Sequence, residues 1–495
     1  MDRMTWTKLM SPVRGRTGED YRGNVTSNDP RSEFEKDYQR IISSASFRRL
    51  QDKTQVFPLD KSDFIRTRLT HSLEVANFAR SIGRMLGMKI VAENIDADFT
   101  NQTTDDICAV LECAGLLHDI GNPPFGHFGE DAIRDWFKEN LDKIDYKGQK
   151  LSDVLNEQQK NDFYKFEGNT QALRVVTKLH FMVDEHGMNL TQALLCTIMK
   201  YPGSSLEIKY DKNDPDRDIA HKKMGYFYAD RNIYELATRC CGTFGRRHPL
   251  AFALEAADDI AYRTADIEDA VKKKLIDVPL LIFELKKAID AAEIIQFTDK
   301  LDRSSIIEKT RWSVSKLENY YNRALENGYE NPNLYAIQNW IVRVQGLELT
   351  CAVDSFIQNY DSIMEGNYKE ELLSGTAGSL IMEVLGDVAY RYAFISEPIL
   401  KLEVAADAIF NYLLERLVTA LRYYDTELWK EKSTAVDQKM VGLISSSFMQ
   451  TYKIHSEGRS EVDKLYLRLL LATDYVSGMT DSFAKRLYQE LRGID

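Results

Sequence analysis

The stretch from residue 116 to residue 130 reads LLHDIGNPPFGHFGE and surrounds a Gly/Pro turn with side chains that bind metals or carry protons. His118 and Asp119 precede the turn at the end of an apolar helical pattern, and His127 and Glu130 follow it. A helix that ends in Gly and Pro leaves its last side chains at an opening rather than in a packed interior. The stretch therefore predicts a metal or proton-transfer site that is open to a substrate.

Histidines cluster around this turn. The chain holds eight histidines in 495 residues, so a window of about 57 residues should contain roughly one. Residues 71–127 nevertheless contain three, namely His71, His118 and His127. A divalent cation that must also admit water and substrate takes about three or four protein ligands from imidazole and carboxylate groups. Two of these histidines, with Asp119, supply three such ligands.

A fourth ligand is expected from residues 254–262, which read LEAADDIAY. Paired acids inside an apolar helix are costly unless a charge or a metal matches them. Either Asp258 or Asp259 therefore completes the set.

The elements that must position these residues are helical. Apolar residues spaced by three and four predict a helix over 70–87, with Thr70 as its cap and His71 in its first turn. A second helix over 104–119 ends with His118 and Asp119. Further helices are predicted at about 169–185, 190–200, 248–275 and 278–296, and through most of 303–493. The fold class is predicted to be mainly α.

The remaining segments set the domain organisation. A short β-hairpin is predicted between Ser205 and Tyr228, and the polar stretch 147–162 is predicted as a loop. Residues 1–32 are predicted to form an N-terminal arm that orders on the rest of the molecule or on a neighbour. We place a catalytic helical core at 33–275 and a helical C-terminal region at 276–495, which we expect to complete the substrate pocket and to form oligomer contacts.

Composition limits the class of protein. The 76 acidic and 64 basic residues give a net charge of -12, which argues against indiscriminate binding to DNA or to an anionic membrane. The six cysteines form no CxxC pair and are interpreted as reduced core residues. The N-terminus lacks a hydrophobic signal core, and no segment approaches the ~18 uninterrupted apolar residues of a membrane span. We expect a soluble, cytoplasmic protein.

The ordered set of His71, His118 with Asp119, and Asp258 resembles the H…HD…D pattern of HD-domain phosphohydrolases. The likeness extends to the deoxynucleoside triphosphate triphosphohydrolases, in particular to the bacterial dGTP triphosphohydrolase (dGTPase) branch. The string GNPPFGHFGE is close to a signature of that branch. The matching blocks span roughly residues 40–270 and are FRRL at 47–50 with QV at 55–56, RLTH at 68–71, HDIGNPPFGH at 118–127, and 258–266.

The resemblance implies an HD-type helical core with one divalent cation per active site, Mg²⁺ or Mn²⁺. His71, His118, Asp119 and Asp258 would hold it. Asp258 is preferred to its neighbour because the metal-binding Asp of the family stands four residues before a Tyr, and Tyr262 fits only that register.

The same resemblance implies that His127 and Glu130 handle protons near the α-phosphate, with the division of labour between them left open. Gln55 matches the family position near the sugar 3′-hydroxyl. Tyr262 and Asp266 match residues that contact the deoxyribose, where a Tyr ring against C2′ would exclude a 2′-hydroxyl. The remaining residues implied to contact phosphate or to complete the pocket are Arg68, Asn122, Asn169, Lys200, Tyr201, Lys222 and Lys223.

The activity implied is metal-dependent hydrolysis of a deoxynucleoside triphosphate, with dGTP favoured, to deoxynucleoside and inorganic triphosphate. Another HD phosphohydrolase, such as a 5′-nucleotidase or phosphodiesterase, would share the metal ligands. A non-catalytic sensor of nucleotides or single-stranded DNA is a further alternative, against which His127 and Glu130 argue. The resemblance also implies a homo-oligomer, a hexamer or tetramer, whereas a regulatory site for a nucleotide or single-stranded DNA has no support in the sequence.

Overall fold

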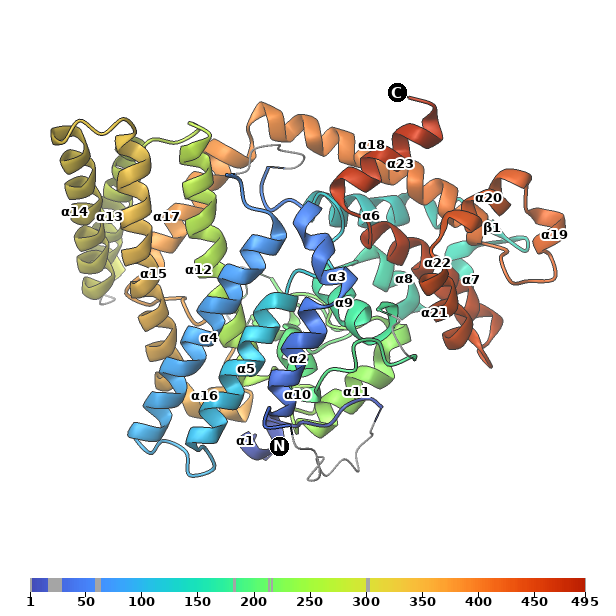
Figure 1. The fold of residues 1–495 in the computed structure, drawn as a ribbon, viewed down its shortest axis with the longest axis horizontal. Coiled ribbons are helices and arrows are strands. Elements are labelled where there is room, and N and C mark those ends of the chain that lie inside the picture. Colours follow the sequence, from blue (N-terminus) through green and yellow to red (C-terminus); the bar gives the residue numbers. More distant parts are fainter. Residues whose placement is uncertain are drawn as a thin grey trace.

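The fold is mainly α, as the sequence predicts. The computed structural model describes residues 2–16, 29–57, 64–180, 184–211, 214, 217–299 and 303–494. Within these residues the single sheet is a hairpin of two short antiparallel strands, β1 (Asp145–Tyr146) and β2 (Gln149–Lys150). Figure 1 shows this hairpin at the opposite end of the molecule from helices α13 to α15.

The first half of the chain contributes most of the short helices. Its helices, with η marking 3-10 and π turns, are α1 (Trp6–Leu9), α2 (Glu33–Ile42), α3 (Ala45–Arg48), η1 (Arg49–Asp52), α4 (Arg68–Ala92), α5 (Asn101–Leu117), α6 (His127–Asn140), α7 (Leu151–Val154), α8 (Glu157–Tyr164), α9 (Gly168–Arg174), η2 (Val175–Leu179), α10 (Gln192–Ile198), η3 (Ile219–His221), η4 (Tyr228–Asp230), α11 (Arg231–Cys240) and α12 (Pro249–Lys272).

The second half is built from longer helices. They are α13 (Val278–Asp299), α14 (Ser304–Glu326), α15 (Pro332–Gln358), α16 (Tyr360–Glu365), α17 (Ser379–Ala389), η5 (Tyr390–Phe394), α18 (Glu397–Leu421), α19 (Trp429–Lys432), α20 (Ala435–Leu443), α21 (Ser446–Ser456), α22 (Glu461–Ser477) and α23 (Asp481–Arg492). Helix α18 runs along one side of the molecule and ends near α20 and the β-hairpin (Figure 1).

The hairpin predicted between Ser205 and Tyr228 is wrong. The described residues of that stretch form no strand, and its residues 212, 213, 215 and 216 lie outside the described part. Gly225 instead donates its backbone N–H to the Gly203 carbonyl at 2.7 Å. A Cβ at 225 would overlap the carbonyl oxygen of Tyr201, so this backbone packs against the segment that follows α10. The actual hairpin begins just before the polar stretch 147–162, which also contains α7 and most of α8 and is therefore not the predicted loop.

The described part of the N-terminal arm lies against the same chain. The Met4 N–H donates to the Met364 carbonyl at 2.8 Å, next to α16. Arg14 is buried and donates to Asp37 of α2 at 2.6 Å. Residues 17–28 of the arm lie outside the described residues.

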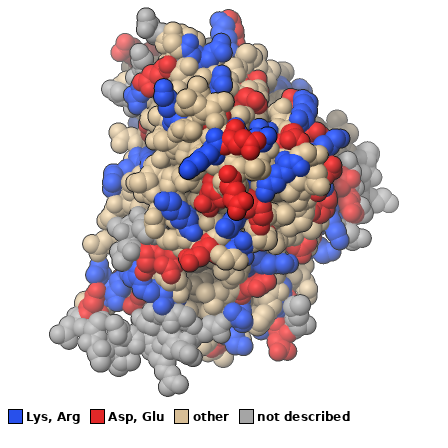
Figure 2. All heavy atoms as spheres, turned by 90° about the vertical axis from the view of Figure 1, so that its right-hand side faces the viewer, with Lys and Arg blue, Asp and Glu red and all other residues tan. Residues whose placement is uncertain are grey.

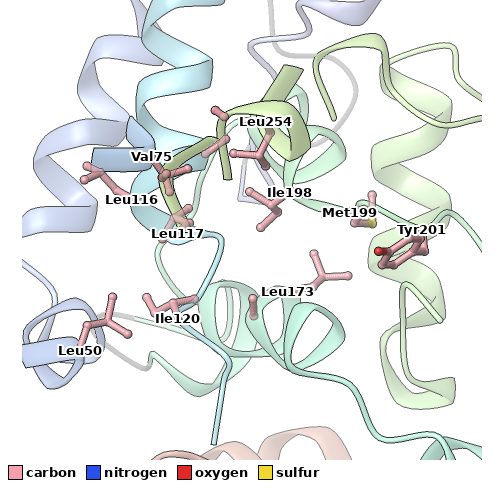
Figure 3. Packing of buried hydrophobic residues seen from close by; sticks show 14 of the residues in the cluster. Leu50, Val75, Leu116, Leu117, Ile120, Leu173, Ile198, Met199, Tyr201 and Leu254 are labelled. Atoms are coloured by element: carbon pink, nitrogen blue, oxygen red, sulfur yellow. The ribbon is translucent and has the colours of Figure 1, made fainter. Parts of the chain in front are cut away.

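An apolar layer joins the helices that carry the candidate ligands. Figure 3 shows Val75 of α4, Leu117 of α5, Ile198 of α10 and Leu254 of α12 among the buried residues of one core cluster. Each of these four side chains is at most 3 % exposed. Burying a side chain of this kind stabilises the fold by about 1.5–3 kcal/mol. This apolar layer therefore fixes α4, α5, α10 and α12 relative to one another beside His71 and His118.

The surface carries charges of both signs. On the face drawn in Figure 2, Lys and Arg side chains are interspersed with Asp and Glu, and acids gather near the centre of the view. This face therefore presents no continuous basic stripe. In the part of the chain that the structure describes, each helix is too short or too polar to cross a bilayer.

Candidate active site

Helix α4 presents His71 from its first turn. Thr67, rather than the predicted Thr70, caps this helix, and the two threonines form a reciprocal capping box. Because side chains in the first turn lean back toward the helix start, His71 projects past the end of α4. Its side chain is 1 % exposed.

Helix α5 brings His118 to the same place. Gly115 lets α5 approach α4 closely, since a Cβ at 115 would lie 2.5 Å from Ala76 Cα. The ring centroids of His71 and His118 are consequently 5.1 Å apart, in an edge-to-face arrangement. His118 Nδ1 lies 2.7 Å from the carbonyl oxygen of Gly115, which can only accept, so Nε2 is the nitrogen available to the site.

Two carboxylates face these imidazoles. Asp258 Oδ1 of α12 lies 3.2 Å from His71 Nε2 and 3.4 Å from His118 Nε2. Asp119 Oδ2 lies 3.5 Å from His118 Nε2. The ligand atoms of His71, His118 and Asp119 all lie within 4.8 Å of one another. Two imidazole nitrogens and two carboxylates form a donor set that fits one divalent cation.

The structure separates the two candidate acids of α12. Asp258 faces the histidines, whereas the charge of Arg263 acts on Asp259. Burial raises the pKa of Asp259 to about 7 despite Arg263. Burial would also raise the pKa of Asp258, but Lys200 and His118 hold it well below its usual value. Asp258 is therefore the acid that stays ionised beside the histidines.

Two cations contact the cluster. Arg68 Nη1 donates to Asp119 Oδ2 at 2.6 Å, and Lys200 Nζ donates to Asp258 Oδ2 at 2.7 Å. Both cations are buried. Their positive charges offset the negative charges of the two carboxylates.

The Gly/Pro turn after His118 is packed tightly. Gly126 has a φ of 62°, and a Cβ there would lie 2.5 Å from Arg68 Nη2. A Cβ at Gly121 would overlap the backbone of Ala172 in α9. Lys53, which the sequence did not single out, donates to the carbonyls of Asn122 and Ser477 at 2.5 and 2.8 Å. Burial lowers the pKa of this lysine to about 7.

His127 and Glu130 form a hydrogen-bonded pair at the start of α6. His127 Nδ1 lies 2.8 Å from Glu130 Oε2. The side chain of His127 is 76 % exposed at the cavity, whereas that of Glu130 is 2 % exposed. The other oxygen of Glu130 accepts the backbone N–H of Gly168 at 2.7 Å. The carboxylate is thus fixed from both sides and orients a ring that solvent or substrate can reach.

Each residue of this pair stabilises the charged form of the other. The hydrogen bond and the charge of Glu130 raise the pKa of His127 above its ordinary value. Burial would raise the pKa of Glu130, but the His127 hydrogen bond and the charges of His127, Lys223 and Arg134 lower it to about 2. Glu130 is therefore ionised at neutral pH.

Nearly all the sequence-predicted site residues line one cavity of about 730 Å³. His118 lies behind its wall, in contact with Asp258. The predicted residues that line it are Gln55, Arg68, His71, Asp119, Asn122, His127, Glu130, Asn169, Lys200, Tyr201, Lys222, Lys223, Asp258, Tyr262 and Asp266. This volume is within the range of small-molecule sites.

One side of the cavity offers polar groups from α12 and from the segment around Gln55. Tyr262 and Asp266 are one helical turn apart on α12 and line the cavity together with Gln55. Burial raises the pKa of Asp266 well above its usual value, which favours the protonated form that can donate a hydrogen bond. Gln55 Oε1 is buried and has no hydrogen-bond partner among the residues that the structure describes.

Several lining residues were missed by the sequence analysis. Glu167 is buried and accepts hydrogen bonds from Lys223 Nζ and Asn169 Nδ2, both at 2.9 Å. Glu371, between α16 and α17, lies 3.2 Å from Lys222 Nζ. The position of Glu167 beside Asn169 was a usable signal, but nothing in the sequence around Glu371 set it apart.

An apolar wall completes the cavity, and its individual residues were not predicted. It comes from the C-terminal region and includes Tyr390 and Phe394 of η5, Ile399 and Leu400 of α18, and Ile395 between these two helices. Tyr390 is 61 % exposed and Ile395 is 51 % exposed, so these side chains present open apolar surface.

Comparisons with known proteins agree with this arrangement. Residues 68–201 match the HD domain family. The chain is 44 % identical to the deoxyguanosinetriphosphate triphosphohydrolase-like protein of Listeria monocytogenes, over 99 % of this chain and 100 % of that protein. It is 32 % identical to the probable deoxyguanosinetriphosphate triphosphohydrolase of Pseudomonas aeruginosa, over 95 % of each. It is 30 % identical to the deoxyguanosinetriphosphate triphosphohydrolase of an Enterobacter species, over 93 % of this chain and 94 % of that protein.

Proposed function

Because the chain belongs to the family of deoxyguanosinetriphosphate triphosphohydrolase-like proteins with an HD domain, we propose that it hydrolyses a deoxynucleoside triphosphate, with dGTP favoured. The products are the deoxynucleoside and inorganic triphosphate. One observation carries the proposal: the His/Asp cluster, the His127–Glu130 pair and four Lys or Arg side chains all border a single cavity. A phosphate-ester hydrolase needs these three elements together.

The proposed metal ligands are His71, His118, Asp119 and Asp258. These residues fit a cation because His118 Nε2 is buried and has no hydrogen-bond partner in the described part of the chain, and it lies 3.5 Å from Asp119 Oδ2 and 3.4 Å from Asp258 Oδ1. A bound Mg²⁺ or Mn²⁺ would polarise the α-phosphate and lower the pKa of the attacking water.

His127 is proposed to supply the proton that the reaction needs. Water attacks the α-phosphorus and releases a proton to solvent, the bond from phosphorus to the 5′-oxygen breaks, and His127 protonates that oxygen as the deoxynucleoside leaves. His127 then regains a proton from solvent. Glu130 keeps the imidazole charged and oriented, since its carboxylate is held by Gly168 N–H on one side and by His127 on the other.

The remaining lining residues are proposed to recognise substrate. Arg68, Lys200, Lys222 and Lys223 would bind the triphosphate, with Asn122, Asn169 and Tyr201 at its edges. Tyr262 and Asp266 would contact the deoxyribose, and Gln55 the 3′-hydroxyl. The buried and unpartnered Oε1 of Gln55 supports this, because a substrate hydroxyl can donate to it.

We also propose that the protein assembles as a homo-oligomer, a hexamer or tetramer, and that residues 276–495 complete the substrate pocket. Support for the second statement is the contribution of Glu371, Tyr390 and Phe394 to the cavity wall. Light scattering after size-exclusion chromatography tests the first.

The decisive experiment is product analysis. Purified protein is incubated with each of the four dNTPs and with GTP, in Mg²⁺ or Mn²⁺, and the products are separated by ion chromatography. We expect inorganic triphosphate and deoxynucleoside, fastest from dGTP. Pyrophosphate with a deoxynucleoside monophosphate would refute the proposed reaction, and release from a cyclic dinucleotide alone would assign another HD phosphohydrolase.

A further inference from the structure

The candidate site is lined by more acids than bases. Among the described residues that border the cavity, nine are acids and four are Lys or Arg. The acids are Asp119, Glu130, Glu167, Glu255, Asp258, Asp259, Asp266, Glu371 and Glu403, and the cations are Arg68, Lys200, Lys222 and Lys223. A polyphosphate that enters this cavity therefore meets carboxylates as well as cations.

Each of the four cations already has a carboxylate partner. Arg68 and Lys200 pair with Asp119 and Asp258, which belong to the proposed metal cluster. The other two pairs lie outside that cluster. Lys223 Nζ lies 2.9 Å from Glu167 Oε1, and Lys222 Nζ lies 3.2 Å from Glu371 Oε1.

The two lysines are adjacent in sequence, yet their partners come from distant segments. Glu167 lies at the start of α9, with its side chain 3 % exposed. Glu371 lies in the loop between α16 and α17, with its side chain 35 % exposed. Hydrogen bonds between the Ile219 N–H and the Lys369 carbonyl, and between Arg217 and Glu370, tie this loop to the segment that carries the lysines.

Glu167 is fixed independently of Lys223. Its Oε1 also accepts a hydrogen bond from Asn169 Nδ2 at 2.9 Å, and Arg134 Nη1 lies 3.9 Å from its Oε2. Lys223 differs from Glu167, because its side chain is 34 % exposed and its ammonium group sits on a long stem of rotatable single bonds. The lysine can therefore exchange partners while the carboxylate stays in place.

On the basis of the function proposed above, we propose that Glu167 and Glu371 are placeholder carboxylates. They hold Lys223 and Lys222 when no triphosphate is bound, and they compete with the triphosphate for these lysines. They form these ion pairs with the lysines again when inorganic triphosphate leaves. Both are positioning residues that act on the substrate through the lysines.

The competition has a kinetic consequence. Inorganic triphosphate carries several negative charges and keeps every phosphate contact that the substrate made. Phosphate contacts that are equally strong in the substrate and in the product lower KM without accelerating the chemical step. They also slow product release. A carboxylate that reclaims each lysine weakens this binding and shortens the time that the product stays bound.

The test measures binding of inorganic tripolyphosphate to the metal-loaded full chain by isothermal titration calorimetry. Glu167→Gln and Glu371→Gln keep the side-chain length and an acceptor oxygen but remove the charge. We expect each variant to bind tripolyphosphate about fivefold more tightly than the unsubstituted protein. The matched control is Asp135→Asn, which removes an exposed acid of α6 that pairs with Lys138 and does not line the cavity. We expect no change there.

Steady-state kinetics with dGTP gives a second measurement. Each Gln variant is expected to lower KM and kcat together and to strengthen inhibition by tripolyphosphate. A merely structural role would raise KM instead, because a disturbed pocket binds less well. If Glu167→Gln fails to fold, Glu371→Gln still decides, since its loop is half-exposed.

The outcomes separate the two proposals. Unchanged or weaker tripolyphosphate binding in both variants overturns the placeholder role, even if dGTP is hydrolysed. Failure of the protein to release triphosphate from dGTP overturns the proposed function, while tighter binding in the variants still supports the competition. No binding of tripolyphosphate to the unsubstituted protein or to either Gln variant also overturns the placeholder role, whereas the dGTP assay alone decides the proposed function.

Discussion

The ring of His118 is oriented by its own helix, because Nδ1 lies 2.7 Å from the carbonyl oxygen of Gly115 one turn earlier. That carbonyl is left free at the end of α5, where no later N–H continues the helix. The ring is thereby fixed with Nε2 toward Asp119 and Asp258. A ligand held this way loses little conformational freedom when a metal binds.

Substitutions in the metal cluster and in the proton-handling pair should have separable effects. His118→Ala or Asp119→Ala removes a ligand, so we expect loss of the bound metal together with the activity. His127→Ala should keep the metal and lower turnover by about 10²–10⁴-fold, the usual contribution of a general acid or base. Metal content by inductively coupled plasma mass spectrometry, measured beside turnover, checks this split. Loss of metal from His127→Ala would contradict it.

The pH profile of turnover should depend on Glu130. His127 acts as a proton donor while it is protonated, so turnover falls as the pH rises through its pKa, which Glu130 raises. Glu130→Gln removes that charge and lowers the pKa of His127. We expect the falling alkaline limb to move to lower pH by about one unit, from rates measured across the pH range at saturating dGTP. An unmoved limb would assign it to another group.

The same pair predicts a pH dependence of stability. The pKa of Glu130 in the folded protein is about 2, below its ordinary value of 4.5. Its contribution to the free energy of unfolding is therefore present above pH 4.5 and lost as the pH falls toward 2. Thermal unfolding of the unsubstituted protein and of Glu130→Gln should converge over that interval.

Much of the fold and the candidate site could be predicted because the relevant information is local. The apolar spacing of α4, α5 and α12 indicated helices, and the spacing of His118, Asp119 and His127 around Gly and Pro indicated an opening. Helix-end residues such as these are positioned mainly by their own helix.

The features that were missed depend on contacts between distant segments. The predicted hairpin at 205–228 failed because Gly225 packs on residues 201–203 rather than on residues 207–210. Glu371 reaches the cavity only because its loop binds the segment around Ile219. The spacing of apolar residues in either segment does not predict these contacts.

Gly168 should be intolerant of a side chain although it binds no substrate itself. A Cβ at 168 would overlap Asn122 Oδ1 and lie 2.7 Å from Glu130 Oε1. Gly168→Ala must therefore displace Glu130, and we expect turnover to fall by about 10²-fold, since small misplacements of catalytic groups have effects of this size. Gly442→Ala is the control, because a Cβ there meets nothing within 4 Å. It should leave kcat unchanged and should not lower the unfolding temperature.

Tyr262 should determine whether a ribonucleotide is accepted. Its ring lines the cavity one turn from Asp266, where it is proposed to contact the sugar. Tyr262→Val opens space for a 2′-hydroxyl, so we expect the ratio of kcat/KM for dGTP over GTP to fall by at least about tenfold. An unchanged ratio, with both rates reduced, would show that the ring supports the pocket without reading the sugar.

The buried pair of Arg174 and Asp474 should be essential for stability, because it joins α9 below the site to α22 of the C-terminal half. Arg174 Nε and Nη2 donate to the two oxygens of Asp474 at 2.8 and 2.7 Å, and both side chains are at most 4 % exposed. Asp474→Ala leaves the buried Arg174 with the longer contact to Asp230, at 3.3 Å, so it should lower the free energy of unfolding by up to about 3–5 kcal/mol.

The exposed pair of Arg84 and Asp105 is the matched control for this prediction. Its two atoms lie 2.9 Å apart, but the side chains are 47 % and 60 % exposed. Solvent screens such a pair, and Asp105→Ala should therefore cost at most about 1 kcal/mol. Chemical denaturation of both variants measures the difference. Equal losses would mean that α9 and α22 are held together by their apolar contacts rather than by the buried charges.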